Sequence, residues 1–335
     1  MEQKLDLGFK VNSVSQDIQK APERRVERIE NALSFGVRYL DLALGGIWST
    51  DCLLIGAKTG AGKTELAISI AAHNALRCKK VLMLALEAEQ GEVGERLLYR
   101  RLISRMKDPD DQEITYPIEG VFNFMDWSLG KFKSIESVEA KISQEVGELY
   151  KNFDVYYRGL ERFGLDELKK VLLENCKNYD LIIIDHIHYL DILSDNENRE
   201  LTDCISTIRN ICQVNRKPVI VVGHIRKGDS RSKQLVPDLE DFHGTSNLGK
   251  IATKSVMLGA CHDQSYMQTN KWPTYLRVSK CRRDGSRVRY TAIVQFDTVQ
   301  NAYESKFIPG RLEKDGTEFV QIAHNDVPYW ARSDR

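Results

Sequence analysis

Short runs of consecutive apolar residues alternate with helical patterns along this chain. The runs are residues 52–55, 80–86, 155–157, 181–184 and 219–222, apolar throughout except for Lys80 at the start of the second. A run that is apolar throughout is typical of a strand buried on both faces of a parallel sheet. The helical patterns, with apolar residues three and four positions apart, cover residues 66–71, 91–105, 165–178 and 197–215. This alternation predicts an α/β fold with a mostly parallel central sheet and helices on both faces.

Weaker patterns surround this core. Residues 22–33 predict a short helix outside the sheet, with Val26, Ile29 and Leu33 on one face. Either a neighbouring subunit or the chain's own domain would cover that face. Residues 35–46 are interpreted as the lead into the first strand, with a turn at the double glycine 45–46. Within residues 107–152, the segment whose organisation is least evident, residues 135–150 have a helical pattern.

The C-terminal part has the pattern of a hairpin. Residues 275–278 and 289–296 flank a turn at 283–285, which predicts two antiparallel strands that extend one edge of the sheet. A helix and a further strand are expected through residues 251–258. The chain is therefore divided into an N-terminal arm with a subunit-docking helix, a large α/β domain and a C-terminal tail, over residues 1–34, 35–310 and 311–335.

Composition narrows the class of protein. The 48 basic and 48 acidic residues balance, so any surface for nucleic acid must be local. The seven cysteines form no CxxC pair, and we interpret them as reduced thiols. The N-terminus lacks an apolar signal core, and no apolar run approaches the ~18 residues of a membrane helix. We therefore expect a cytoplasmic protein with no membrane segment.

The first strand leads directly into a glycine-rich turn and a helix. Glycines let backbone N–H groups surround an anion, and the N-terminus of the helix adds its positive dipole end. Lys63 would supply a charge for the outer phosphates, and the Thr64 hydroxyl is placed to ligate Mg²⁺. Five residues, 57–61, separate Gly56 from Gly-Lys-Thr, where the general pattern has four. The pattern predicts nucleoside triphosphate binding by Gly56, Thr59, Gly60, Ala61, Gly62, Lys63 and Thr64.

Three other strands end in polar residues. Glu87, Asp185 and His224 follow the runs at 80–86, 181–184 and 219–222. In a parallel sheet these ends meet at one edge, where ligands bind. Triphosphate hydrolysis requires a carboxylate to support Mg²⁺, a residue to activate water and a group that contacts the terminal phosphate. Asp185, Glu87 and His224 suit these roles in turn. Any one of them alone could simply end a strand, but their coincidence with the phosphate loop favours a site.

The order of these motifs resembles the RecA-like ATPase domain of ring helicases, the DnaB type and its phage and mitochondrial (Twinkle-type) relatives. The five-residue spacer in the phosphate loop is also found in that family. The histidine at position 224 is similar to the phage and mitochondrial branch, since DnaB proteins have glutamine there. The resemblance covers about residues 35–300. The matching pieces are Gly36, Leu40-Asp41, Gly45-Gly46, the loop 56–64, Leu86-Glu87, Ile183-Ile184-Asp185, Gly223-His224 and Lys280-Cys281-Arg282.

The resemblance implies a hexameric ring in which one subunit completes its neighbour's site. It implies that Arg282 projects into the neighbouring ATP site as an arginine finger, with Lys280 as its companion. Arg283 is a rival, because Arg283-Asp284-Gly285 fits the DnaB pattern one position later. A plain solvated hairpin turn is the remaining interpretation.

The resemblance also implies that single-stranded DNA is held by the loop after the histidine strand. Four basic residues lie there among small ones, and no aromatic residue, so contact with the DNA backbone is expected. Lys250 and Lys254 are candidate additions. An ordinary solvated loop is the alternative, and residues 238–244 match the family's DNA-contacting segment only in part. The four candidate DNA-binding residues are Arg226, Lys227, Arg231 and Lys233.

The sequence thus predicts an ATP- and Mg²⁺-dependent homo-hexameric helicase that translocates on single-stranded DNA in replication. Only some 35 residues precede the α/β domain, so we expect no primer synthesis by this chain, and a separate primase or polymerase as a partner. The alternative is a RecA-like recombination mediator or regulatory ring, in which ATP switches binding to DNA or protein without unwinding. Stimulation of hydrolysis by single-stranded DNA would distinguish the two.

Overall fold

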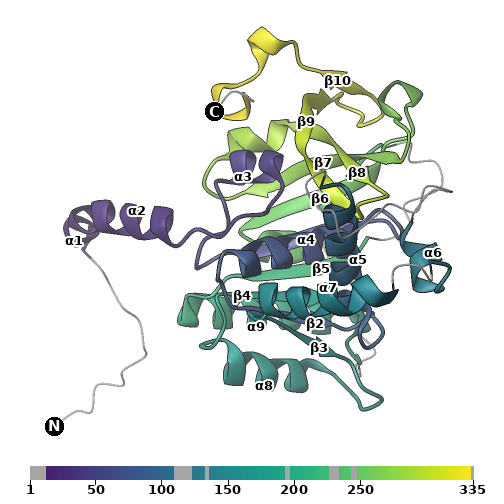
Figure 1. The fold of residues 1–335 in the computed structure, drawn as a ribbon. Coiled ribbons are helices and arrows are strands. Elements are labelled where there is room, and N and C mark those ends of the chain that lie inside the picture. The colour runs from purple at the N-terminus through teal and green to yellow at the C-terminus, as the bar shows by residue number, and fades with distance from the viewer. Residues whose placement is uncertain are drawn as a thin grey trace.

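One ten-stranded sheet runs through the molecule (Figure 1). The computed structural model describes residues 13–108, 123–132, 136–192, 197–225, 234–242 and 247–332. Within them the strand order is β10-β9-β8-β7-β6-β1-β5-β4-β2-β3. The six strands from β6 to β3 are parallel to one another, as predicted. Their bounds are β1 Cys52–Ala57, β2 Val81–Ala85, β3 Phe153–Tyr157, β4 Leu181–Asp185, β5 Val219–His224 and β6 Lys254–Ala260.

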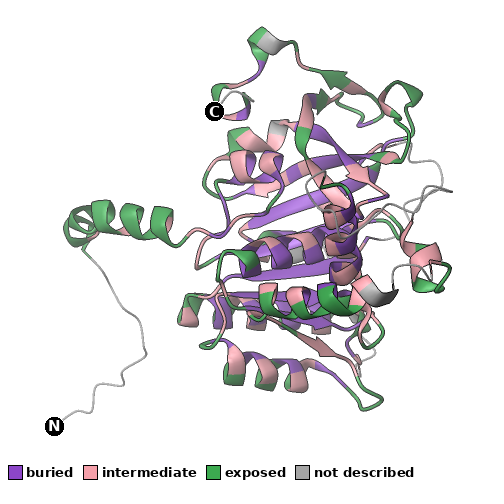
Figure 2. Cartoon of the chain, in the orientation of Figure 1, coloured by how far each residue is buried: buried purple, intermediate pink, exposed green. Residues whose placement is uncertain are grey.

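Helices cover both faces of the parallel part because alternate residues of each strand enter two separate cores. Leu53 and Ile55 of β1 pack on one side, with α3 Arg38–Leu44, α4 Lys63–Leu76, α5 Glu92–Met106 and α7 Glu136–Leu149. Cys52 and Leu54 pack on the other, with α8 Leu165–Asn175 and α9 Glu197–Asn215. Figure 2 shows the strands buried between the two layers. The doubly covered sheet and the helices α4, α5, α7, α8 and α9 confirm the predicted architecture.

Four antiparallel strands extend the sheet beyond β6. The predicted hairpin consists of β7 Lys271–Cys281 and β8 Thr291–Asp297, joined through residues 282–290. Two unpredicted strands, β9 Ala302–Leu312 and β10 Phe319–Gln321, continue it. The predicted boundary between the α/β domain and the C-terminal tail, at residues 310 and 311, therefore lies within β9. The tail then returns to the body, where Trp330 packs edge to face on Tyr290 with 5.2 Å between ring centroids.

The N-terminal arm projects away from the body (Figure 1). It consists of α1 Val14–Gln19 and α2 Ala21–Glu30. Val26 and Ile29 of α2 are exposed, as the predicted apolar face requires. Leu33 was wrongly placed on that face: it lies beyond the helix, where it is buried and forms an isolated bridge with Ile47. The ion pair of Glu27 with Arg216, 2.7 Å, ties α2 to the body.

Among the described residues, the short helices α1, α3 and α6 were not predicted. The lead into β1 contains α3, which ends at Gly45 in the left-handed conformation with φ of +67°. Within residues 107–152, α6 Phe124–Ser128 packs Phe124 and Trp127 on Tyr99 of α5. A five-residue helix, α10 Asn247–Ile251, precedes β6. Among the described residues, no helix is both long enough and apolar enough to cross a membrane.

Candidate functional site

The phosphate loop joins β1 to α4 at the carboxyl edge of the sheet. Gly60 and Gly62 have φ of +78° and +86°, a left-handed conformation that side chains other than glycine rarely adopt. Lys63 is buried, and its ammonium donates to the Lys58 carbonyl at 3.1 Å, closing the loop on itself. Burial lowers the pKa of Lys63, while Asp185 and Glu87 raise it. The loop thus holds the Lys63 ammonium against its own backbone.

Glu87, Asp185 and His224 come together as expected. Asp185 and His224 end β4 and β5, and Glu87 lies just beyond β2; these strands lie side by side next to β1. The three residues line a cavity of about 400 Å³ that also contains Thr59, Gly60, Gly62, Lys63 and Thr64. Four adjacent parallel strands thus place the phosphate loop, two carboxylates and an imidazole around one cavity.

Asp185 has the environment of a metal-supporting carboxylate. It is 1% exposed and interacts with the Thr64 hydroxyl, while its Oδ1 has no hydrogen-bond partner among the described residues. Burial, more than the nearby Glu87, raises its pKa to about 7. A buried oxygen without a donor beside a threonine hydroxyl fits a hydrated Mg²⁺, which prefers oxygen ligands. The residues present therefore fit the divalent cation that accompanies a bound triphosphate.

A histidine that the sequence pattern did not reveal lies between the predicted residues. His186 is buried, and its ring stacks on His224 with centroids 4.0 Å apart. Its Nε2 lies 3.5 Å from Glu87 Oε2, and burial lowers its pKa to about 2. The hydroxyl of Tyr189 donates to Glu87 Oε1 at 3.1 Å. The Tyr189 phenol therefore orients the Glu87 carboxylate, and the neutral imidazole of His186 lies beside it.

A buried ion cluster fixes the start of α4. The Glu65 carboxylate pairs with Arg96 and, at 2.5 Å, with Arg100, both from α5. Arg96 also pairs with Glu92 at 2.6 Å. Burial lowers the pKa of Arg100 to about 10, so its guanidinium stays charged at neutral pH. Glu92, Glu65 and Arg96 also line the cavity, so the cluster joins the phosphate loop to α5.

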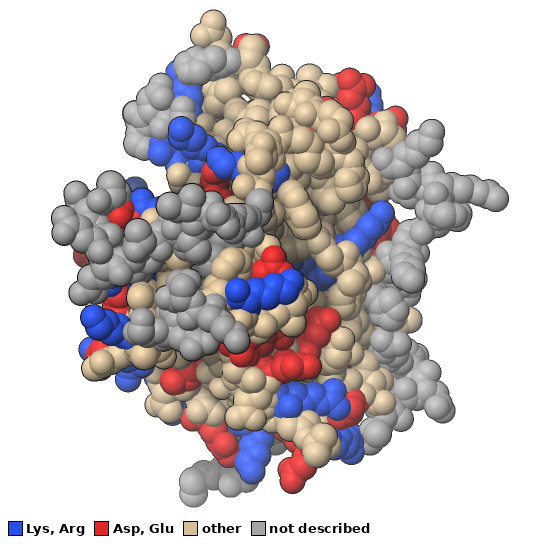
Figure 3. Space-filling model, turned by 45° about the vertical axis from the view of Figure 1, so that its right-hand side comes forward, with Lys and Arg blue, Asp and Glu red and all other residues tan. Residues whose placement is uncertain are grey.

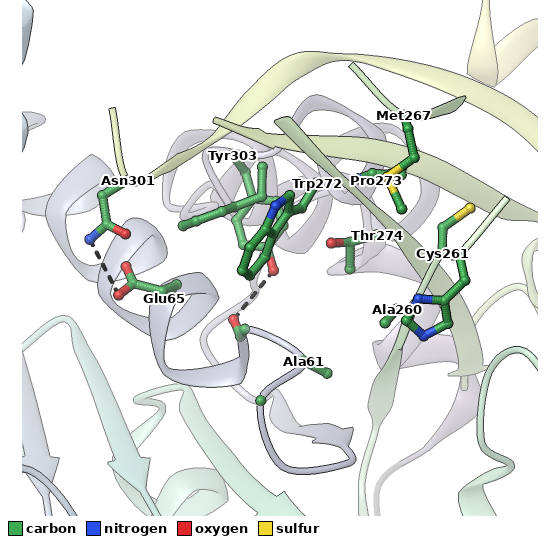
Figure 4. Close-up of a pocket in the computed structure, with 14 residues that line it drawn as sticks. Ala61, Glu65, Ala260, Cys261, Met267, Trp272, Pro273, Thr274, Asn301 and Tyr303 are labelled. Carbon is green, nitrogen blue, oxygen red and sulfur yellow. Dashed lines mark hydrogen bonds between the residues drawn. The ribbon is translucent and has the colours of Figure 1, made fainter. Parts of the chain in front are cut away.

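A second cavity, of about 470 Å³, opens on the other side of the phosphate loop. Figure 4 shows Ala61 of the loop on one side, with Trp272, Thr274 and Tyr303 of the antiparallel strands facing it. The Tyr303 hydroxyl donates to the Gly62 carbonyl at 3.3 Å, and Asn301 donates to Glu65 at 3.4 Å. The two cavities share Gly60, Gly62 and Glu65. This apolar wall was not predicted from the sequence: Trp272 and Thr274 lie in the part of β7 that precedes the predicted strand, and Tyr303 lies in the unpredicted β9.

The finger candidates lie at the far end of β7. Arg282 and Arg283 are exposed, and the Arg282 N–H donates to the Thr253 carbonyl at 3.0 Å. Lys280 donates to the carbonyls of Gly249 and Lys250, at 2.6 and 3.0 Å. Its ammonium therefore stabilises the C-terminal end of α10. The companion role of Lys280 and the choice between the two arginines stay predictions.

The predicted DNA-binding residues Arg226, Lys227, Arg231 and Lys233 lie outside the described residues. Lys250 is exposed, but the suggestion that Lys254 contacts DNA is wrong. Lys254 is 2% exposed and pairs with Asp51 at 2.5 Å, so its charge is neutralised inside the body. Basic and acidic side chains are interspersed over the face shown in Figure 3, in agreement with the balanced charge.

Comparisons with known proteins agree with this architecture. The family model for the DnaB-like helicase C-terminal domain matches residues 32–301. The replicative DNA helicase DnaB of Buchnera aphidicola subsp. Schizaphis graminum is 22% identical over 261 residues, covering 73% of this chain and 52% of the relative. The corresponding protein of Mycoplasma genitalium is 22% identical over 299 residues, covering 85% and 58%. The chain thus spans about half the length of the curated relatives it matches.

Solved structures show the same fold. One solved ATPase domain aligns with a TM-score of 0.62 at 14% identity, covering 94% of this chain and all of that domain. A DnaB-like replicative helicase, described together with its interactions with primase, aligns with a TM-score of 0.57 at 15% identity, covering 94% and 68%. The family match confirms the predicted DnaB-type relationship, and the structures confirm the RecA-like fold: the chain belongs to the DnaB-like helicase C-terminal domain family.

Proposed function

We propose that this chain hydrolyses ATP in a Mg²⁺-dependent reaction and uses the energy to move along single-stranded DNA and separate duplex strands during replication. The observation that carries the proposal is the single cavity in which Lys63, Glu87, Asp185 and His224 meet beside the phosphate loop. Family membership supports the same activity.

The two cavities suit the two ends of a nucleotide. The loop backbone and Lys63 bind the phosphates, and the apolar wall with Trp272 and Tyr303 takes the base and ribose. Mg²⁺, when bound, neutralises charge on the phosphate oxygens. Thr64 and Asp185 would hold it on the protein side, with Asp185 in its ionised form.

Glu87 is the proposed general base. Its side chain is 39% exposed, so water reaches it, and the Tyr189 hydroxyl fixes its direction. It accepts a proton from the water that attacks the terminal phosphorus, while the bond to the leaving diphosphate breaks. His224, at the end of β5, is proposed to contact the terminal phosphate. Its position would then depend on whether that phosphate is present, and would be coupled to the following segment, where the predicted DNA-binding residues occur.

Arg282 is the proposed finger, acting on the nucleotide of a neighbouring copy in a ring. A cation supplied in trans makes hydrolysis depend on the interface between subunits. The exposed face of α2, with Val26 and Ile29, is the proposed docking element of that ring. A separate primase or polymerase is a further proposed partner.

The test is the rate of ATP hydrolysis with and without single-stranded DNA, for the unaltered chain and for Arg282→Ala, Arg283→Ala and Lys63→Ala. We expect strong stimulation by DNA, its loss in Arg282→Ala with nucleotide binding retained, and no activity in Lys63→Ala. Hydrolysis that ignores DNA would instead favour a regulatory ring. Loss confined to Arg283→Ala would move the finger by one position.

A further inference from the structure

Trp48 lies at a junction that the proposed reaction does not use. It belongs to the turn between α3 and β1, where two hydrogen bonds fix it. Its backbone N–H donates to Asp51 Oδ2 at 2.8 Å, and its indole N–H donates to the Gly45 carbonyl at 2.8 Å. The orientation of the indole is therefore set by its own turn, independently of what its faces contact.

Three cations surround this one indole. The Lys254 ammonium lies 4.3 Å from the ring centroid, the Arg283 guanidinium carbon 4.9 Å and the Arg28 guanidinium carbon 5.7 Å. All are within the ~6 Å at which a cation is attracted to an aromatic ring. They come from β6, from the turn after β7 and from α2, so the indole joins three parts of the chain that are distant in sequence.

The charges of the three cations are not balanced equally. Lys254 pairs with Asp51 at 2.5 Å. Within the described ranges, Arg28 and Arg283 form no ion pair with an acidic residue. Burial lowers the pKa of Arg28, and the neighbouring Arg283 lowers it further. Two guanidinium groups that repel each other are thus held near one surface, and the indole is the group that attracts both.

Arg283 is the residue next to the proposed finger. The Arg282 backbone is anchored to its own sheet by the bond to Thr253, and Arg283 is anchored by the indole. We propose that Trp48 is a positioning residue that holds Arg283 on its own subunit and so sets the direction in which Arg282 projects. Through Arg28, the same indole links the finger turn to the docking arm. This inference rests on the proposed function and goes beyond it by giving Arg283 a role within its own subunit.

Amide hydrogen exchange tests the contact directly. Trp48→Leu removes the aromatic face and should accelerate exchange at residues 282–284, whereas Trp48→Phe, which keeps a smaller face, should accelerate it less. Arg28→Met removes a repelling charge and should slow it. The matched control is Trp330→Leu, because Trp330 holds Arg287 at 4.5 Å in the same way. It should affect residues 284–290, because Arg287 also pairs with Asp284 at 2.8 Å, and leave residues 282 and 283 unchanged. Unchanged exchange at 282–284 in Trp48→Leu would overturn the proposal.

Mixing subunits tests the direction of the effect. Trp48→Leu should lower kcat for ATP hydrolysis about tenfold, with KM unchanged, as expected for one lost cation–π contact that positions a catalytic charge. Lys63→Ala should be inactive alone but still present an intact finger turn. Rings that contain both variants should therefore hydrolyse ATP faster, per Trp48→Leu subunit, than rings of Trp48→Leu alone. No gain on mixing would show that Trp48 acts within its own site and would contradict the proposal.

The two assays separate two failures. The exchange comparison requires no hydrolysis, so it judges Trp48 even if the unaltered chain proves inactive with ATP. If the unaltered chain does not hydrolyse ATP, the proposed function is contradicted. If it does hydrolyse ATP but Trp48→Leu leaves the exchange rate unchanged, only the role of Trp48 is contradicted.

Discussion

Glu65 offers a quantitative test of how burial changes the contribution of an ion pair to the free energy of unfolding. The substitution Glu65→Gln removes the charge that Arg96 and Arg100 share and keeps the size of the side chain. The side chains of Glu65, Arg96 and Arg100 are 11%, 21% and 11% exposed. Arg96 keeps its second partner, Glu92, so Arg100 is the guanidinium left without a carboxylate.

The expected loss follows from that geometry. Removing one partner of a buried pair costs about 3–5 kcal/mol, because the remaining charge stays out of water. Since Arg96 keeps Glu92, we expect the lower end, about 3 kcal/mol of the free energy of unfolding. Glu145→Gln is the matched control, because Glu145 also bridges two arginines of α5, Arg101 and Arg105, with side chains 27–32% exposed. Its loss should be about 1 kcal/mol or less.

Urea unfolding followed by far-UV circular dichroism measures both values. The slope against urea should be the same in the two variants, so that the midpoints report stability. Added salt should reduce the Glu145→Gln effect more than the Glu65→Gln effect, because exposed charges are screened more strongly. A Glu65→Gln loss no larger than that of Glu145→Gln would refute the reasoning that burial makes this cluster a structural link between the phosphate loop and α5.

Three further predictions address the site. In the folded protein the pKa of Asp185 is raised from 3.8 to about 7, so the Mg²⁺-dependent part of nucleotide binding should weaken as the pH falls below about 7. Titration calorimetry should show this pH dependence in the unaltered chain and its disappearance in Asp185→Asn. Nucleotide binding that does not change between pH 6 and 8 would contradict the prediction. Glu87→Gln should retain nucleotide binding and lose hydrolysis by about 10²-fold or more, measured in single turnovers, and a rate near that of the unaltered chain would remove Glu87 as the base. Gly56→Ala should lower the melting temperature, because a Cβ there would lie 2.7 Å from the Phe242 ring; overpacking of this kind costs about 1–3 kcal/mol, and unchanged melting would show that Phe242 moves away freely.

The parallel core could be predicted because each of its strands must have apolar side chains on both faces. β2, β4 and β5 are buried on both faces, so nearly every position is apolar, and the first polar residue marks where each strand reaches the ligand edge. That is why Glu87, Asp185 and His224 were found from the pattern alone. The phosphate loop was recognisable for a similar reason, since its backbone geometry requires glycine at positions 60 and 62.

Features that depend on distant contacts were not predictable. Glu65, in the first turn of α4, resembles an ordinary favourable charge near a helix N-terminus, and its partner Arg100 lies 35 residues later. His186 becomes notable only when β4 and β5 place it against His224. In α3, the leucines at 40, 42 and 44 also fit an alternating pattern, and the seven-residue helix is decided by packing and by Gly45.

Strand separation on a forked DNA duplex is the decisive measurement for the proposed helicase activity, with the unaltered chain and Lys63→Ala compared at equal concentration. The unaltered chain should release the displaced strand only when ATP and Mg²⁺ are both present, and Lys63→Ala should release none. Hydrolysis of ATP without any strand separation would contradict the helicase proposal and leave an ATP-driven switch in its place.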